Sequence, residues 1–126
     1  MISSERLNLV TLEEKHLELL RKMRNDPSTW QWLTDTYPIT ESAQSRWFEG
    51  LQNDKERLYL AIENKKGTFM GMIRSDAWDR TNRSIRVGSD IAPKYRGQGY
   101  GTEALRAFID YLFKQQNLHR VWLLVA

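Results

Sequence analysis

Six consecutive residues, Arg96-Gly97-Gln98-Gly99-Tyr100-Gly101, have the composition of an anion-binding turn. Alternating apolar residues precede them (85–91), and apolar residues at helical spacing follow them (104–112). Glycines let the backbone approach a ligand without a Cβ in the way, and the first N–H groups of a helix attract anions. The pattern predicts a phosphate site where a strand turns into a helix. A turn without a ligand is the alternative interpretation of the same glycines.

Two well-known phosphate motifs do not fit this turn. A Walker A loop ends in Gly-Lys-Ser/Thr, whereas Gly101 is followed by Thr102 and Glu103. In a dinucleotide fingerprint the third glycine follows the second by three positions, and here Gly101 comes one residue early. The turn therefore indicates a phosphate-containing ligand held by neither of these two motifs.

Length and composition restrict the remaining possibilities. A chain of 126 residues predicts one domain, residues 1–126, with a core of moderate size. The absence of cysteine excludes disulfides, thiolate zinc sites and an acyl-cysteine intermediate. Because the two histidines are far apart in the sequence, we expect no metal site. No apolar run approaches the length of a membrane span, and Glu5 and Arg6 interrupt any apolar leader. We expect a cytoplasmic protein without a membrane partner.

The net charge of +3 is modest. Nucleic-acid binding would favour a denser basic stripe interleaved with aromatic residues, so we expect no nucleic-acid partner. A solvated basic face and a polyanionic ligand both remain compatible with the local basic excess. That excess consists of Arg74, Arg80, Arg83, Arg86, Lys94 and Arg96.

Hydrophobic periodicity predicts a mixed α/β (α+β) fold. An antiparallel meander is followed by a strand, a helix and a further strand, which gives a parallel pair. A polar loop is expected at 76–82. Predicted strands cover 6–10, 57–63, 68–74, 83–91 and 120–125, and predicted helices begin after Thr11, Asp26, Thr40 and the glycine turn.

The stretch 91–104 resembles the coenzyme A-binding motif of the GNAT superfamily of N-acetyltransferases, as does the order of elements from Glu5 onward. The segments Arg24-Asn25-Asp26-Pro27, Trp30/Trp32 and 117–121 resemble the branch of ribosomal-protein N-terminal, polyamine and amino-sugar acetyltransferases. The resemblance implies a GNAT-like acyl-CoA N-acyltransferase fold. It also implies transfer of acetyl from acetyl-CoA to a primary amine of a small molecule or protein N-terminus, by direct attack.

Two other functions remain open at this point. One is a catalytically weak coenzyme A-binding module. The other is a structural or nucleic-acid-binding α/β domain whose glycine turn holds no ligand.

The resemblance also implies a set of cofactor contacts. The pantetheine arm would pair with backbone groups of the strand before the turn, and the diphosphate would lie on N–H groups at the helix start. Tyr100 needs only its backbone for this role. The residues implied are Ser89, Ile91, Arg96, Gly97, Gln98, Gly99, Tyr100, Gly101 and Thr102.

Asp90 is the candidate general base, directly or through a water molecule. Strand alternation places Arg86, Gly88 and Asp90 on one face. A surface aspartate, or one paired with an arginine, is the alternative. Many members of the branch carry glutamate near the position of Arg86, so the catalytic role does not transfer simply. His16 is interpreted as a half-buried packing residue rather than a catalytic one.

The resemblance places acceptor recognition in the first two helices and the loop after the third strand. Acidic and aromatic groups together suit a cationic amine, although each tryptophan has packing in the core as its alternative role. The candidate substrate-binding residues are Trp30, Trp32, Asp35, Tyr37, Asp76 and Trp78, with Asp79 beside them.

The chain ends directly after the apolar run 121–125. Members of the superfamily normally continue with a helix and two strands, so we expect a C-terminally incomplete form of the fold. A truncated chain, a homodimer in which a second copy covers the last strand and a natural short form are the three explanations.

Overall fold

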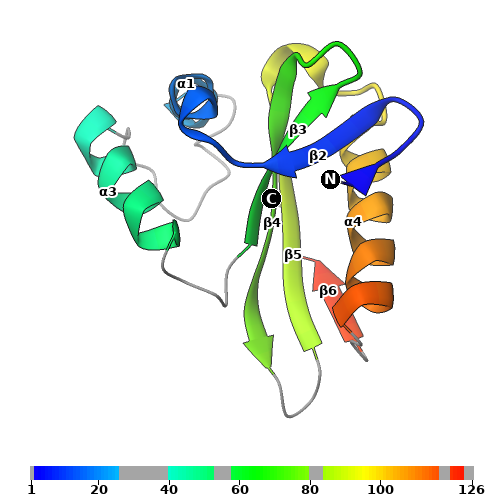
Figure 1. The fold of residues 1–126 in the computed structure, drawn as a ribbon. Helices are drawn as coiled ribbons and strands as arrows, with labels where there is room; N and C mark the ends of the chain where they lie inside the picture. Colours follow the sequence, from blue (N-terminus) through cyan, green and yellow to red (C-terminus); the bar gives the residue numbers. More distant parts are fainter. Residues whose placement is uncertain (1, 26–39, 53–57, 80–83, 117–119, 124–126) are drawn as a thin grey trace.

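A single mixed sheet organises the molecule (Figure 1). The computed structural model describes residues 2–25, 40–52, 58–79, 84–116 and 120–123. Six strands lie in chain order, β1-β2-β3-β4-β5-β6. Neighbours from β1 to β5 are antiparallel, whereas β6 runs parallel to β5. This confirms the predicted meander followed by a parallel pair.

The elements have the following bounds. The strands are β1 (Ile2–Ser3), β2 (Leu7–Thr11), β3 (Leu58–Asn64), β4 (Phe69–Asp79), β5 (Ser84–Ile91) and β6 (Arg120–Leu123). The helices are α1 (Leu17–Asn25), α3 (Glu41–Gln52) and α4 (Tyr100–Gln116), with 3-10 turns η1 (Glu14–His16) and η2 (Pro93–Tyr95).

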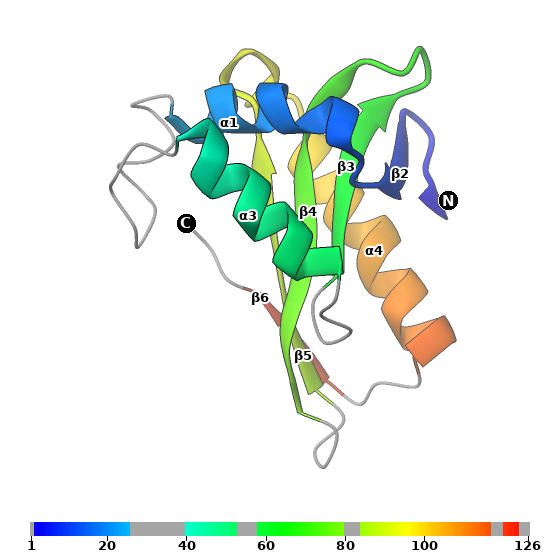
Figure 2. The same cartoon turned by 60° about the vertical axis from the view of Figure 1, so that its left-hand side comes forward.

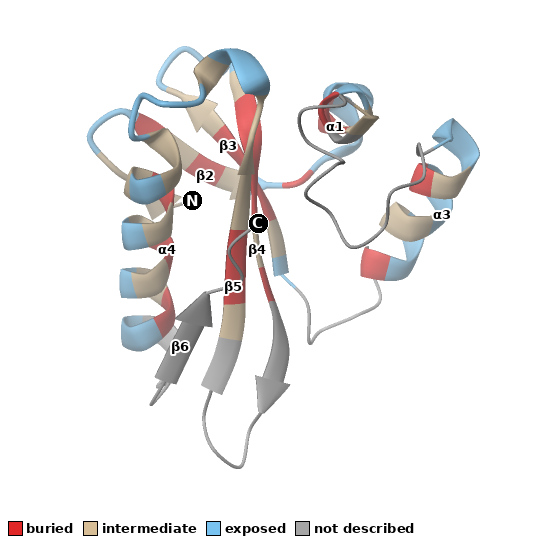
Figure 3. Ribbon diagram, turned by 180° about the vertical axis from the view of Figure 1, so that it is seen from behind, coloured by how far each residue is buried: buried red, intermediate tan, exposed pale blue. Residues whose placement is uncertain are grey.

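The helices cover opposite faces of the sheet. Helices α1 and α3 lie together on one face, and α4 lies on the other (Figure 2). Each face buries its own apolar cluster, and buried residues line the side of α4 that faces the strands (Figure 3). The α4 face includes Leu7, Leu9, Leu60, Ile62, Met70, Ile73, Val87, Ala104, Phe108 and Leu112, and the α1/α3 face includes Leu12, Leu20, Met23, Leu51, Ala61 and Met72.

A β-bulge at Met70 changes which face β4 presents. Ile62 pairs with Gly71 and Glu63 pairs with Phe69, so Met70 is an extra residue in β4. For this reason Met70 packs on the α4 face although Met72, two residues later, packs on the opposite face. A Cβ at Gly71 would lie 2.2 Å from the Asp90 carbonyl oxygen, so the bulge requires glycine where β5 crosses closely.

One local prediction is confirmed and two others are wrong. Thr40 Oγ1 accepts a hydrogen bond from the Ala43 N–H (3.1 Å), as expected of an N-cap. Thr11 does not cap a helix: it belongs to β2, and Glu13 precedes η1 instead. The polar loop expected from residue 76 is also wrong at its start, because β4 continues to Asp79.

His16 is more deeply buried than its expected half-buried position, with 2% of its surface exposed. Its Nδ1 accepts the Glu13 N–H (2.9 Å), so the ring proton lies on Nε2, which donates to Glu63 Oε2 (2.9 Å). Nδ1 therefore caps the start of η1, and Nε2 joins η1 to the end of β3. This geometry supports the packing role rather than a catalytic one.

Candidate functional site

The glycine turn has the backbone geometry of a ligand-binding loop. Gly97 (φ +76°) and Gly99 (φ +83°) both adopt left-handed conformations that favour glycine. Helix α4 begins immediately afterwards, and its opening hydrogen bond joins the Glu103 N–H to the Gly99 carbonyl (3.0 Å). The N–H groups of Tyr100, Gly101 and Thr102 precede this first bond, so they have no intrahelical acceptor and are available to an anion.

The turn packs against the end of β5. A Cβ on Gly101 would lie 3.5 Å from Ile91 Cγ1 and 3.7 Å from Ser89 Oγ. Arg96 is exposed, and its Nε donates to the Ile91 carbonyl (2.9 Å). The structure therefore brings the predicted strand residues and the predicted turn residues together at one corner.

One edge of β5 is only partly paired by the described part of β6. The parallel ladder runs from Ser84↔Arg120 to Val87↔Leu123. Residues 88–91 extend beyond that ladder toward the glycine turn, while their other edge pairs with β4. Backbone groups along this edge that no strand pairs need a hydrogen-bond partner, and the amides of a pantetheine arm have the required chemistry.

Asp90 lies on the opposite face from α4. It pairs in register with Met72, whose side chain belongs to the α1/α3 cluster. Arg74 Nη1 donates to Asp90 Oδ2 (2.9 Å), and both side chains are mostly buried. This ion pair is the arrangement that the sequence left open as an alternative to a catalytic role. Arg86 shares this face by strand alternation and is half-buried.

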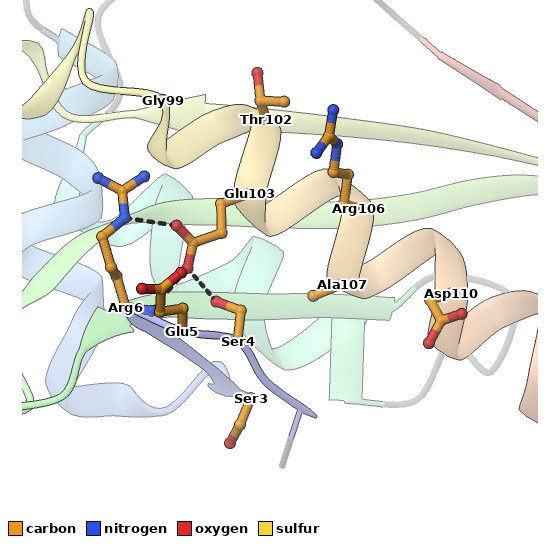
Figure 4. Close-up of a pocket in the computed structure, with 10 residues that line it drawn as sticks. All are labelled: Ser3, Ser4, Glu5, Arg6, Gly99, Thr102, Glu103, Arg106, Ala107 and Asp110. Atoms are coloured by element: carbon orange, nitrogen blue, oxygen red, sulfur yellow. Dashed lines mark hydrogen bonds and ion pairs between the residues drawn. The ribbon is translucent and has the colours of Figure 1, made fainter.

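A polar cluster that sequence reasoning missed lies directly beneath the turn (Figure 4). Arg6 Nε donates to Glu103 Oε1 (2.6 Å), and the Arg6 N–H and Ser4 Oγ both donate to Oε2 (2.8 and 2.5 Å). Burial raises the pKa of the Glu103 carboxyl, but the hydrogen bonds from Ser4 and Arg6 outweigh it and lower this pKa overall. The hydrogen bond with Glu103 raises the pKa of Arg6.

A groove runs beside this cluster, between the N-terminal segment and α4. In Figure 4, Ser4 and Arg6 point toward Glu103 from the turn between β1 and β2. The groove meets the glycine turn at Gly99 and Thr102. Its lining comprises Ser3, Ser4, Glu5, Arg6, Gly99, Thr102, Glu103, Arg106, Ala107 and Asp110.

The predicted acceptor-binding residues are only partly placed. Trp30, Trp32, Asp35 and Tyr37 lie outside the described residues. Asp76 and Trp78 lie on β4, where Asp76 pairs with Arg86 and the register becomes irregular before Asp79. The backbone thus places Asp76 on the strand beside β5, four positions along β4 from the residue that pairs with Asp90.

The described ranges contain neither a metal-binding cluster nor a membrane-spanning helix. Within them, His, Asp and Glu side chains form no group of three that could hold a metal ion. None of the helices in the described part of the chain has the length and apolarity needed to cross a membrane.

Comparison with known proteins identifies the family. The model of the acetyltransferase (GNAT) domain matches residues 6–126. The chain is 23% identical to spermidine N(1)-acetyltransferase of Vibrio cholerae over 98% of its own length and 71% of that protein. It is 28% identical to YdaF of Bacillus subtilis, a protein provisionally named as a ribosomal N-acetyltransferase, over 98% of its own length and 70% of that protein.

Solved structures show the same fold. The Vibrio cholerae spermidine N-acetyltransferase in complex with CoA and spermine superposes with a TM-score of 0.86 at 21% identity, covering 95% of this chain and 71% of that one. A GNAT-family acetyltransferase from Bacillus anthracis gives a TM-score of 0.82 at 23% identity, covering 95% and 70%. The family match covers nearly the whole sequence, and these solved structures share its fold: the chain belongs to the GNAT superfamily of N-acetyltransferases.

Proposed function

We propose that this N-acetyltransferase uses acetyl-CoA as its acyl donor and a primary amine as its acceptor. The observation that carries the proposal is the corner where β5 meets α4. There, two left-handed glycines and the N–H groups of the helix start adjoin residues 88–91 of β5, which lie beyond the ladder with the described part of β6. The amides of a pantetheine arm match the edge of β5, and a diphosphate matches the helix start that follows it.

The donor residues that we propose are those predicted from the sequence. Main-chain N–H groups of residues 97–102 bind the diphosphate, and the backbone of Ser89 and Ile91 binds the pantetheine amides. Arg96 contributes its positive charge beside the turn, because its own N–H donates to the Pro93 carbonyl (3.3 Å). When bound, acetyl-CoA supplies an acyl group activated as a thioester. The structure of the CoA complex of the Vibrio cholerae enzyme, which has the same fold, supports this choice of donor.

The chemistry proposed for the acceptor is direct attack. The neutral amine nitrogen attacks the thioester carbonyl and a C–N bond forms. The C–S bond then breaks, its electron pair leaves on sulfur as the coenzyme A thiolate, and this thiolate takes up a proton from solvent. The proton lost by nitrogen passes to Asp90 or to a water that Asp90 holds, because Asp90 lies at the end of β5 next to the proposed pantetheine contacts. Arg74 fixes the orientation of the Asp90 carboxylate through the ion pair on Oδ2.

The proposed acceptor is a small-molecule amine such as a polyamine, with a protein N-terminus as the second class. The names of two relatives, one a spermidine and one a ribosomal N-acetyltransferase, support these classes. The acidic and aromatic residues Trp30, Trp32, Asp35, Tyr37, Asp76 and Trp78 are the acceptor contacts that we propose. Cytoplasmic location and a homodimer that covers β6 also remain proposals.

A panel of amines tests the proposed activity. The chain is incubated with acetyl-CoA and, separately, spermidine, an amino sugar and an N-terminal peptide, and products are identified by mass spectrometry. Acetylation of at least one amine is the expected result. Binding of CoA without transfer to any amine would favour the second candidate function, a coenzyme A-binding module.

Asp90→Asn tests the proposed base. Removal of a general base should lower kcat by about 100-fold while leaving the KM for acetyl-CoA nearly unchanged. Asp110→Asn is the matched control, because Asp110 forms an exposed ion pair with Lys114 on α4 (3.0 Å) and takes no part in the proposed chemistry. Equal kcat values for the two variants would assign Asp90 a structural role only.

A further inference from the structure

One arginine from the N-terminal segment contacts the underside of the glycine turn at several points. Besides Glu103, Arg6 reaches the Gln98 carbonyl, which accepts from Nη1 (3.1 Å). Its guanidinium carbon lies 4.4 Å from the centre of the Tyr100 ring. A Cβ on Gly99 would lie 3.4 Å from Arg6 Nη2. A single side chain thus touches the turn and, through Glu103, the first turn of α4.

The contact with Gln98 has a consequence for the next amide. The peptide bond between Gln98 and Gly99 is trans, so its C=O and its N–H point in opposite directions. Because Arg6 holds the carbonyl toward the N-terminal segment, the Gly99 N–H points to the other side of the turn, away from Arg6. Arg6 therefore orients one of the N–H groups proposed to meet the diphosphate.

The positive charge of Arg6 is paired with the carboxylate of Glu103. Its Nε is only 2.6 Å from Glu103 Oε1, and the Glu103 carboxylate also receives the Arg6 backbone N–H and the Ser4 hydroxyl. A guanidinium neutralised in this way is a weak direct ligand for a phosphate, but its planar set of donors is well suited to holding two acceptors at fixed positions.

We propose that Arg6 and Glu103 are positioning residues for coenzyme A, which hold the glycine turn in its diphosphate-binding conformation without contacting the ligand. This inference rests on the proposed function of the turn. It adds a dependence of donor affinity on the N-terminal segment, 92 residues away from Gln98 in the chain.

A simple charge effect makes the opposite prediction for one variant. If the cluster acted only through its charge, Glu103→Gln would remove a negative charge near a polyanion and tighten binding. If Glu103 positions the turn, the same change removes one acceptor oxygen from the cluster and weakens binding. Arg6→Lys keeps the charge but loses the planar set of donors, so positioning predicts weaker binding there too.

The test is a titration of the protein followed by NMR, with glycine labelled by ¹⁵N so that the amides of the turn report directly. Coenzyme A and pantetheine, which lacks the diphosphate, are the two ligands. Arg6→Lys and Glu103→Gln should each raise the Kd for coenzyme A by about tenfold and change the Kd for pantetheine by less than about twofold. Lys114→Met, which breaks an exposed ion pair on the same helix, is the control and should leave both values unchanged.

The outcomes distinguish a failure of the positioning role from a failure of the proposed function. Unchanged or tighter binding of coenzyme A by either variant would overturn the positioning role of that residue while leaving the proposed function intact. Equal weakening for pantetheine would also overturn it, because general destabilisation would then be the cause. Failure of the unmodified chain to bind coenzyme A would overturn the proposed function and this inference with it. Thermal unfolding of each variant verifies that it is folded at the titration temperature.

Discussion

Glu103 is an acid whose ionised form is stabilised by folding. Three donors surround its carboxylate, two from Arg6 and one from Ser4, and they outweigh the effect of burial so that its pKa is lowered. A carboxyl with a lowered pKa contributes stability above its ordinary pKa, and that contribution disappears as the pH falls through the lowered value.

The pH dependence of stability follows from this sign. Glu103→Gln should lower the free energy of unfolding at pH about 6, and the difference from the unmodified chain should shrink as the pH falls from about 5 toward 3. Urea unfolding of both proteins at several pH values measures this difference in the free energy of unfolding. A difference that stays constant over this range would show that the ionised carboxylate contributes no special stability.

At the residue scale, features formed by residues close in the sequence could be predicted, whereas contacts between residues far apart in the sequence could not. The glycines could be predicted to bind a ligand because their spacing and the flanking periodicity lie within one short stretch. Arg6 and Glu103 are 97 residues apart, so nothing in the local pattern connects them. The burial of His16 was underestimated for the same reason, because Glu63 and Phe69 come from later strands.

The bulge in β4 lies beside the end of β5, close to where the glycine turn begins. The Ala92 N–H donates to the Met70 carbonyl (2.8 Å), which holds the chain just after β5 against the bulge. Gly71 lies so close to the backbone of Asp90 that a side chain cannot be added without a shift of the strands.

Gly71→Ala should therefore lower the free energy of unfolding by about 2 kcal/mol. Gly50→Ala is the matched control, because Gly50 lies in helix α3 with no atom close to an added Cβ and should gain about 0.5–1 kcal/mol from helix propensity. Opposite signs in chemical unfolding are the expected result. A stabilising effect at both positions would contradict the close approach at Gly71.

At the element scale, periodicity predicted the strands and helices better than it predicted their ends. Alternating residues correctly indicated β3 and β5, and apolar residues at helical spacing correctly indicated α4. Thr11 and Thr40 both have the side chain of a helix cap, but Thr11 pairs with Leu60 in the sheet. Tertiary pairing overrides a local capping preference, and the same effect extends β4 to Asp79.

Across the whole molecule, the residues proposed for donor binding and the proposed base lie on opposite faces of the sheet. The α4 face supplies the glycine turn and its Arg6–Glu103 support, whereas Asp90 and Arg74 lie on the face covered by α1 and α3. Donor and acceptor would thus approach β5 from different sides. The order of strands was predictable because strands that are consecutive in the sequence are neighbours in the sheet. The Arg6–Glu103 cluster was not, because it depends on how β1 and β2 pack against α4.

The central claim is that this chain binds the diphosphate of acetyl-CoA on the main chain of the glycine turn. Isothermal calorimetry with coenzyme A tests it most directly, using the unmodified chain, Gly97→Glu and Gly67→Glu. Gly97 and Gly67 both have positive φ and open surroundings, so backbone strain is matched, but Gly67 lies in the turn between β3 and β4. The account predicts saturable binding by the unmodified chain and by Gly67→Glu, and none by Gly97→Glu. Equal binding by all three, or no heat from any of them, would contradict it.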